Sequence, residues 1–145
     1  MTMINEFNSV VSNSELWIKD AADALGTDDY RRALQAVRAT LKTVRDRLPV
    51  DEAVNFGSQL PVLLSGYYYE GWKPANTPTK ERSISEFYDS VQKHIDQLGH
   101  PLKAEDIVKP IFSVIASRIS EGETHDLIQM MPNDFRELWP ESVAS

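Results

Sequence analysis

The sequence contains no cysteine and only three histidines among its 145 residues. Without cysteine the chain can form no disulfide, no thiol nucleophile and no cysteine-ligated zinc site. The histidines His94, His100 and His125 show no HExxH spacing, so we expect no metal site and no bound cofactor. A GxSxG turn and a glycine-rich phosphate loop are also missing. Because no catalytic set of residues is present, an enzymatic function has no support in the sequence.

Long apolar runs are missing as well. No stretch approaches the roughly 20 apolar residues that a membrane span requires. Residues 1–15 lack the basic and then apolar pattern of a secretion signal, so we expect a cytoplasmic protein. The net charge of −7 repels a phosphate backbone and argues against general nucleic-acid binding. Alternation of apolar and polar residues with a period of two does not occur over any convincing length, so we expect no sheet.

A helical spacing of apolar residues is the main pattern that the sequence does contain, and its length suits a single domain over residues 1–145. A long helix is expected after Asp29, and Pro49 should end it. Its apolar positions recur in steps of three and four: Ala33, Leu34, Val37, Leu41, Val44 and Leu48. A shorter helix should precede it, with Ser14 as N-cap and Gly26 as the stop. The residues of this shorter helix that should face inward are Leu16, Trp17, Ala21 and Leu25.

The same order of signals returns in the second half of the chain. Ser83 and Glu86 are spaced as a capping box, and Gly99 should end the helix that they begin. Its expected core positions are Phe87, Val91, Ile95 and Leu98. Another apolar helix should follow, carrying Ile107, Val108, Ile111, Phe112, Ile115 and Ile119. Pro110 lies within it and should delay its start or bend it, because proline clashes with the carbonyl group four residues earlier.

A shift of 71 positions aligns the two halves without a gap. It places Ala33 on Ala104, Val37 on Val108, Arg47 on Arg118, Glu52 on Glu123 and Pro61 on Pro132. We therefore predict an all-α bundle of two tandem four-helix repeats, about eight helices in all, over residues 14–72 and 83–140, joined by a linker at 73–82. Short helices should open at Pro61 and Pro132, and Ser120 with Glu123 should form a second capping box. The alternative is that two amphipathic helices align by chance.

Residues 38–72 carry a resemblance to a known family. The matching features are Arg45 and Arg47 on the long helix, Glu52-Ala53, Gln59-Leu60-Pro61 and Tyr68-Tyr69-Glu70-Gly71-Trp72. The likeness continues through Glu86-Phe87, Gly122-Glu123 and Leu138-Trp139-Pro140, so it covers most of the chain. In these features the sequence resembles the bacterial family catalogued as domain of unknown function 2267. The resemblance implies a small all-helical cytoplasmic protein, and it implies no activity and no catalytic or ligand-binding residue.

The segment SGYYYEGW, residues 65–72, is the first candidate site. Tyr67 and Tyr68 fall at helical spacing after Pro61 and should pack in the core. Gly71 should stop the helix and Trp72 should close the end of the core. Tyr69 and Glu70 remain to face a partner or ligand. Packing is the more general interpretation of such a block, because aromatic residues serve cores more often than sites.

A basic stripe on the long helix is the second candidate site. Arg31, Arg38, Lys42 and Arg45 recur in steps of seven, four and three. These cations can receive an acidic partner or a phosphate-bearing ligand. The alternative is pairing with the protein's own carboxylates, for example Asp20 and Asp23 of the first helix, or simple solvation.

The functional hypothesis is a non-catalytic cytoplasmic module for protein interaction, which associates with itself or with another protein. The alternative hypothesis is a small-molecule-binding protein, or an enzyme, with its pocket between the two repeats near Tyr69, Glu70 and Trp72. A weaker third hypothesis is contact of the basic stripe with anionic lipid or nucleic acid. The sequence does not select a partner among these.

Overall fold

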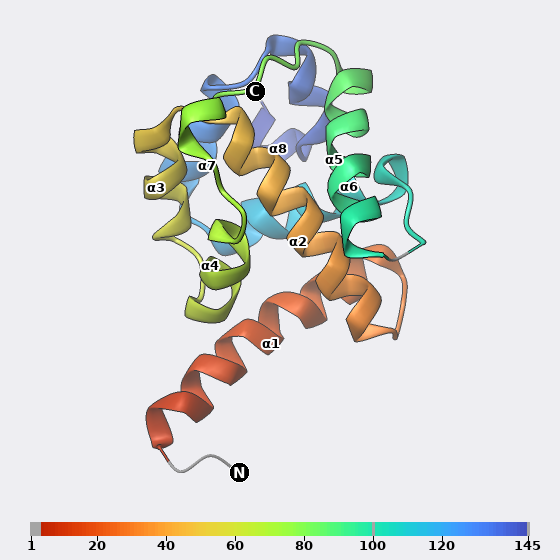
Figure 1. Ribbon diagram of the computed structural model, residues 1–145. Helices are drawn as coiled ribbons and strands as arrows, with labels where there is room; N and C mark the ends of the chain where they lie inside the picture. The colour runs from red at the N-terminus through yellow and green to blue at the C-terminus, as the bar shows by residue number, and fades with distance from the viewer. Residues whose placement is uncertain (1–3, 100, 145) are drawn as a thin grey trace.

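The computed structural model describes residues 4–99 and 101–144, which form helices and no strand, so the protein is all-α (Figure 1). The α-helices are α1 (Asn5–Leu25), α2 (Tyr30–Arg47), α3 (Val50–Gly57), α4 (Val62–Tyr69), α5 (Ile84–Leu98), α6 (Ala104–Arg118), α7 (Glu121–Gln129) and α8 (Glu141–Ala144). Two 3-10 helices, η1 (Pro74–Asn76) and η2 (Asn133–Leu138), complete the set. Within the described ranges, no helix combines the length and the apolar character that crossing a membrane demands.

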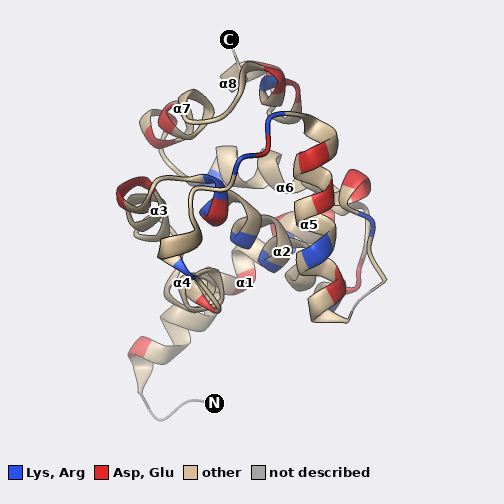
Figure 2. Ribbon diagram, turned by 45° about the horizontal axis from the view of Figure 1, so that its top comes forward, with Lys and Arg blue, Asp and Glu red and all other residues tan. Residues whose placement is uncertain are grey.

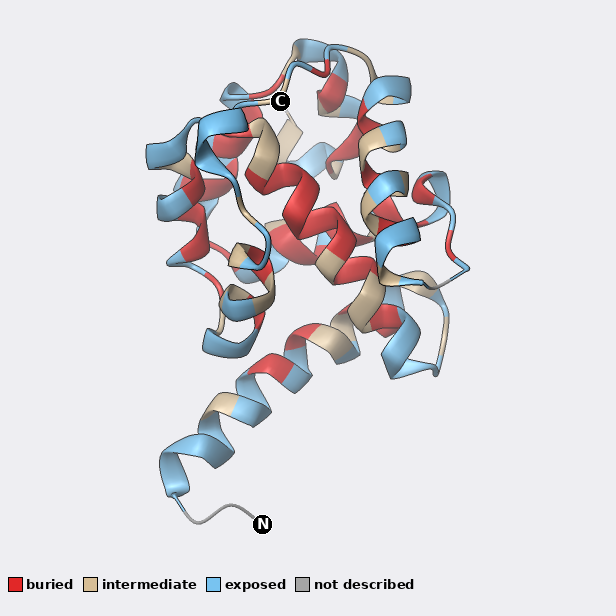
Figure 3. Ribbon diagram, viewed as in Figure 1, coloured by how far each residue is buried: buried red, intermediate tan, exposed pale blue. Residues whose placement is uncertain are grey.

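Helix α2 lies at the centre of the molecule and packs against α1, α4, α5 and α6 (Figure 1). Every residue from Ala39 to Arg45 is buried, including Lys42 and Arg45 (Figure 3). An unbroken run of buried residues means that this stretch of α2 is covered around its whole circumference and not only on its apolar face. The basic stripe predicted from the sequence therefore lies partly inside the protein, where its charges require partners.

Helix α1 begins nine residues before the N-cap that the sequence suggested. It starts at Asn5, so Ser14 is a buried residue within the helix and the prediction of an N-cap there is wrong. Apolar residues upstream, such as Phe7 and Val11, continue the helical spacing past Ser14. Trp17 is buried as expected, whereas the expectation that Leu16 faces inward is wrong: it is 47% exposed, because it lies on the side of the helix opposite buried Ser14. The N-terminal half of α1 projects from the body of the protein (Figure 1).

The helix boundaries follow the predicted signals in most other places. Asp29 caps α2, and Gly26 and Gly99 end their helices in the left-handed conformation, with φ of 69° and 72°. Ser83 and Glu86 form the expected capping box. Pro61 immediately precedes α4, and its carbonyl group accepts the first hydrogen bond of the helix, from the amide of Ser65 at 2.8 Å. These local rules succeed because each depends on only a few neighbouring residues.

Two boundary predictions are only partly right. Helix α6 begins at Ala104 and runs through Pro110, so its start is not delayed, and the alternative of a bend at Pro110 stays a prediction. Ile107 and Val108 are buried in its first turns, and their packing offsets the backbone hydrogen bond that proline removes. Ser120 accepts from the amide of Glu123, but the Glu123 side chain accepts from Asn55 Nδ2 at 3.0 Å and does not return to the cap. The second capping box is therefore only half formed.

The two halves share several element boundaries at the predicted offset of 71. Helices α2 and α6 end at Arg47 and Arg118, and α3 and α7 begin at Val50 and Glu121. The last elements differ, because α4 is an α-helix whereas η2 is a 3-10 helix followed by α8. Shared boundaries support an internal duplication, which stays a prediction.

The predicted linker, residues 73–82, is attached to the C-terminal end of α2. The amide of Thr79 donates to the carbonyl oxygen of Asp46 at 2.8 Å. Glu81 is buried, where its backbone carbonyl accepts from Arg47 Nε at 3.0 Å and its carboxylate accepts from the Ser90 hydroxyl at 2.5 Å. This segment therefore joins the first half to α5 through specific polar contacts as well as through the chain.

Candidate functional site: the cations of α2 at the end of α4

Arg45 connects the central helix to the end of α4. Its Nη1 atom donates to the carbonyl oxygens of Tyr68 at 2.8 Å and Glu70 at 2.9 Å, and its Nε atom donates to Asp46 Oδ1 at 2.9 Å. The side chain is only 3% exposed. The last carbonyl groups of a helix have no partner within the helix, and they carry partial negative charge. The Arg45 guanidinium therefore supplies both the hydrogen bonds and the charge that the end of α4 requires.

Lys42 and Arg38 complete this contact one and two turns earlier on α2. Lys42 Nζ donates to the carbonyl oxygen of Glu70 at 2.9 Å and to its carboxylate at 3.3 Å. Arg38 Nη2 donates to the same carboxylate at 2.9 Å, and its guanidinium lies 4.3 Å from the centre of the Tyr67 ring. Figure 2 shows the basic residues of α2 grouped toward the middle of the molecule. Three of the four cations of the predicted stripe thus share the end of α4.

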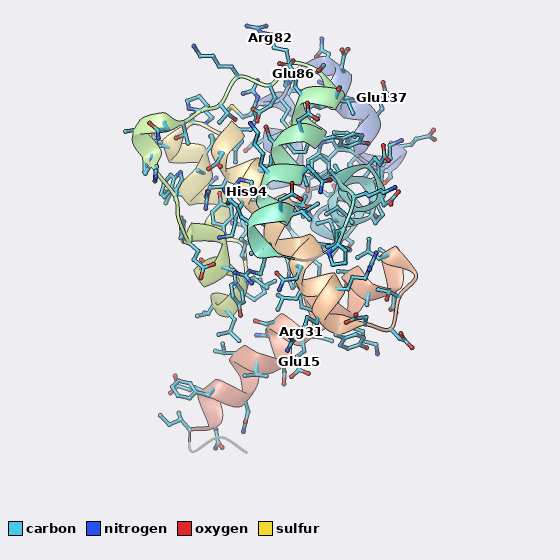
Figure 4. The ribbon with its side chains drawn as sticks, turned by 45° about the vertical axis from the view of Figure 1, so that its right-hand side comes forward. Glu15, Arg31, Arg82, Glu86, His94 and Glu137 are labelled. Atoms are coloured by element: carbon cyan, nitrogen blue, oxygen red, sulfur yellow. The ribbon has the colours of Figure 1, made fainter. Side chains whose placement is uncertain are left out.

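Arg38, Lys42 and Arg45 with Glu70 are here called the cationic cluster, and Asp46 connects this cluster to α5. Its Oδ2 atom lies 3.2 Å from His94 Nε2, and Figure 4 shows His94 on the side of α5 that faces α2. Burial acts to raise the pKa of Asp46, but hydrogen bonds from His94 and Arg45 outweigh it and hold the pKa below its ordinary value. Neither Asp46 nor this role of His94 was expected from the sequence. Their positions three helices apart in the chain gave no local signal.

The charges of the cluster alter two further pKa values. Burial lowers the pKa of the Lys42 ammonium, although its hydrogen bond to Glu70 opposes this effect. The pKa of the Glu70 carboxyl lies below its ordinary value, first because of the hydrogen bond from Arg38 and then because of that from Lys42. Glu70 is thus an anion held by two cations, and its side chain is still 55% exposed.

The aromatic segment packs as a connected set of rings. Tyr68 is fully buried, and its hydroxyl donates to the carbonyl oxygen of Ala53 at 2.6 Å. The centre of the Tyr69 ring lies 4.9 Å from the centre of the Tyr68 ring and 5.6 Å from the centre of the Trp72 ring. Tyr69 and Trp72 are half-buried, and Tyr69 donates its hydroxyl to the carbonyl oxygen of Val54 at 3.3 Å. These contacts assign the tyrosines a packing role, whereas Glu70 is the residue of this segment that faces the cations.

Arg31 does not join the cluster. It is exposed at the start of α2, and none of the described residues forms an ion pair with it. The alternative in which Asp20 of α1 pairs with the basic stripe is not observed. Asp20 accepts from Arg118 Nε at 2.6 Å, so it serves α6 and not the basic stripe.

A cavity of about 260 Å³ opens beside the cationic cluster. Its lining residues come from α2, the end of α4 and α5: Lys42, Arg45, Glu70, Gly71, His94, Gln97 and Leu98. The alternative hypothesis expects a ligand pocket near Tyr69, Glu70 and Trp72. Glu70 lines this cavity, whereas Tyr69 and Trp72 do not, and residues of α5 form the rest of the wall. Ligand binding there stays a prediction. In the described ranges, no three His, Asp or Glu side chains are grouped to hold a metal ion, and His100 lies outside those ranges.

The comparisons with known proteins agree with the resemblance in the sequence. No curated protein matches the chain. A family model described as an uncharacterized conserved protein (DUF2267) matches residues 14–138, which include every residue of the cationic cluster. Since this match covers most of its length, the chain belongs to the DUF2267 family.

Proposed function

We propose that the protein is a non-catalytic helical interaction module, and that its partner is a second copy of the same chain. The contact surface is α1 together with a groove beside it, here called the α1 groove. The groove has a volume of about 340 Å³ and is lined by Val11, Ser14, Glu15, Ile18, Tyr30, Arg31, Leu34, Leu63, Leu64 and Tyr67. The predicted cytoplasmic location belongs to this proposal and stays a prediction.

The first half of α1 has little packing against the part of the chain that the structure describes. No residue from position 4 to position 13 is buried. The segment is rich in asparagine, serine and valine, which are weaker helix formers than alanine, and no side chain caps its start. Helical turns of this composition are marginal without tertiary contacts. A second protein surface that covers them would therefore stabilise the conformation they have.

The uncovered apolar residues of α1 lead directly into the groove. Phe7, Val11, Ser14 and Ile18 follow one another in steps of four, three and four, which places them on one face of the helix. Phe7 is 55% exposed and Val11 is 39% exposed, and Val11 already belongs to the groove wall. In a two-fold dimer, α1 of each chain would lie in the α1 groove of the other. The same contact therefore occurs twice, and in each chain it covers both the apolar face of α1 and the groove.

The charges at this surface complement each other between copies. Residues 4–18 of α1 carry two carboxylates, Glu6 and Glu15, and no cation. Arg31 and Glu15 both line the groove, and Figure 4 shows them close together. Arg31 is the cation of the predicted stripe that forms no ion pair with any of the described residues. An antiparallel partner helix would bring its Glu6 toward Arg31. This complementarity favours a second copy over an unrelated basic helix.

Sedimentation velocity with a matched pair of variants tests this proposal. Phe7→Glu places a charge on the apolar stripe and should shift the protein from dimer to monomer. Leu16→Glu is the control, because Leu16 is also exposed on α1 and lies about 180° around the helix from Phe7. The control should remain dimeric. A wild-type monomer, or equal effects of both variants, would contradict the proposal, and a monomer that binds another protein would assign the groove to that partner instead.

A further inference from the structure

We propose that the cavity beside Lys42 and Arg45 binds the carboxylate group of a small molecule. This site is separate from the α1 groove and adds a ligand to the proposed interaction module. The cavity lies where α2, the end of α4 and α5 meet, so a bound molecule would contact both halves of the chain. Lys42 and Arg45 in its wall are both buried, which distinguishes them from ordinary surface cations.

The cluster around the cavity carries an excess of positive charge. Arg38, Lys42 and Arg45 are balanced by two carboxylates, those of Glu70 and Asp46. Each cation has a partner, but the formal charges of the cluster still sum to at least +1, whatever the charge of His94. An excess of positive charge at a buried site is costly: burial lowers the pKa of Lys42, and the neighbouring charges of Arg45 and Arg38 add to this effect. A bound anion would remove this excess.

Donors for an anion are available in the cavity wall. Arg45 uses its Nε and Nη1 atoms for Asp46 and the α4 carbonyls, and its Nη2 atom has no acceptor in the part of the chain that the structure describes. Gly71 also lines the cavity, and its amide has no backbone acceptor among residues 4–99 and 101–144. A guanidinium and an ammonium together form strong, charge-assisted hydrogen bonds to carboxylate oxygens.

Charge and size together indicate a monocarboxylate. Counted without His94, the excess of one positive charge matches one carboxylate, whereas a phosphate dianion would meet stronger repulsion from Glu70, which also lines the cavity. The volume of about 260 Å³ lies below the range of about 300–1,000 Å³ that is usual for drug-sized ligands, so we expect a short acid. Leu98 and Gln97 in the wall would contact the remainder of such a molecule.

Titration of the wild-type protein with propionate, followed by amide chemical shifts, tests this assignment without any variant. Sodium chloride at the same ionic strength and inorganic phosphate are the comparison titrations. Propionate should shift the resonances of Gly71, Gln97 and Leu98 in a saturable way, and chloride should not. Equal shifts with chloride, saturable shifts elsewhere in the protein only, or tighter binding of phosphate than of propionate would overturn the proposal.

A pair of lysine variants then tests the role of the buried cation. Lys42→Gln removes the charge and should weaken propionate binding by about tenfold or more, which corresponds to about 1.4 kcal/mol. Lys80→Gln is the control, since Lys80 is exposed and is not part of the cavity wall. The Lys80→Gln variant should bind propionate with the affinity of the wild-type protein. If circular dichroism shows that Lys42→Gln is folded and the variant binds propionate as tightly as wild type does, the proposal is wrong. If the variant does not fold, the titration of the wild-type protein decides.

Discussion

Arg45 Nη1 lies 2.8 Å from the carbonyl oxygen of Tyr68, so a cation of the central helix closes the end of α4. This contact explains why the most enclosed helix of the protein carries several arginines and a lysine. Their charges and donors are directed to a helix end that has unpaired carbonyl groups and a partial negative charge. The aromatic segment and the basic stripe, which the sequence presents as two candidate sites, are thus the two sides of one internal contact.

Replacement of Arg45 by methionine should destabilise the fold strongly. The variant leaves the carbonyls of Tyr68 and Glu70 without their donor and removes one partner of Asp46. Loss of one member of a buried ion pair costs about 3 kcal/mol or more. Guanidinium-induced unfolding measures this loss. Arg82→Met is the control because Arg82 is exposed, and its effect should stay below about 0.5 kcal/mol. Equal stability of the two variants would contradict the role assigned to Arg45.

Two glycine-to-alanine substitutions should have opposite signs. A methyl group on Gly57 would overlap the Tyr69 hydroxyl and lie 2.9 Å from Tyr68 Cε2, so Gly57→Ala should cost about 1–3 kcal/mol. Gly66 lies within α4 with no atom within 4 Å of the added carbon, so Gly66→Ala should gain about 0.5–1 kcal/mol through helix propensity. Thermal unfolding of both proteins provides the measurement. A stable Gly57→Ala protein would show that the tyrosines do not pack there.

The Glu70 carboxylate should contribute to stability only above its pKa. Its pKa in the folded protein lies below the ordinary 4.5, because Arg38 and Lys42 bind the ionised form. A carboxyl group of this kind adds stability above pH 4.5 that is lost as the pH falls through the folded pKa. Wild type should therefore be more stable than Glu70→Gln at neutral pH, by a small amount since the side chain is largely exposed. The difference should vanish in acid, and a difference independent of pH would argue against this pairing.

Glu123 should show the opposite behaviour. Burial, followed by the nearby charges of Glu52 and Asp126, raises its pKa above the ordinary 4.5. The ionised form therefore reduces stability, and this cost appears as the pH rises through 4.5 and reaches its full size above the folded pKa. Glu123→Gln can keep the hydrogen bond from Asn55 and should be more stable than wild type at pH 7, by about 1 kcal/mol. Unfolding curves at neutral and acid pH should show the gain only at neutral pH.

Local sequence rules predicted much of the fold. Asp29, Ser83, Gly26 and Gly99 act at the helix ends where their residue types are favoured. The apolar steps predicted for α2 mark residues that are buried, except for the partly buried Leu34. The N-cap preference of serine predicts a start of α1 at Ser14 that is too late, because the apolar spacing of Phe7 and Val11 continues the helix upstream. Inclusion of that spacing would have extended the helix to its observed length.

The candidate site was only partly predictable. Spacing placed Arg38, Lys42 and Arg45 on one face of a helix, but it contained no information on whether that face meets solvent or another element. Their partners, Glu70 and Asp46, and the link from Asp46 to His94 depend on how the helices pack, and packing is a long-range property. Arg31 belongs to the same stripe by spacing, yet it lies about two turns before the covered stretch Ala39–Arg45 and remains exposed.

Sedimentation equilibrium of the wild-type chain tests most directly whether the molecule pairs with itself through α1. Measurements from about 1 µM to about 100 µM cover dissociation constants that correspond to about −8 to −5 kcal/mol. We expect a monomer–dimer equilibrium in this range, which Phe7→Glu moves fully to monomer and Leu16→Glu leaves in place. A single species with the mass of one chain at every concentration would contradict it.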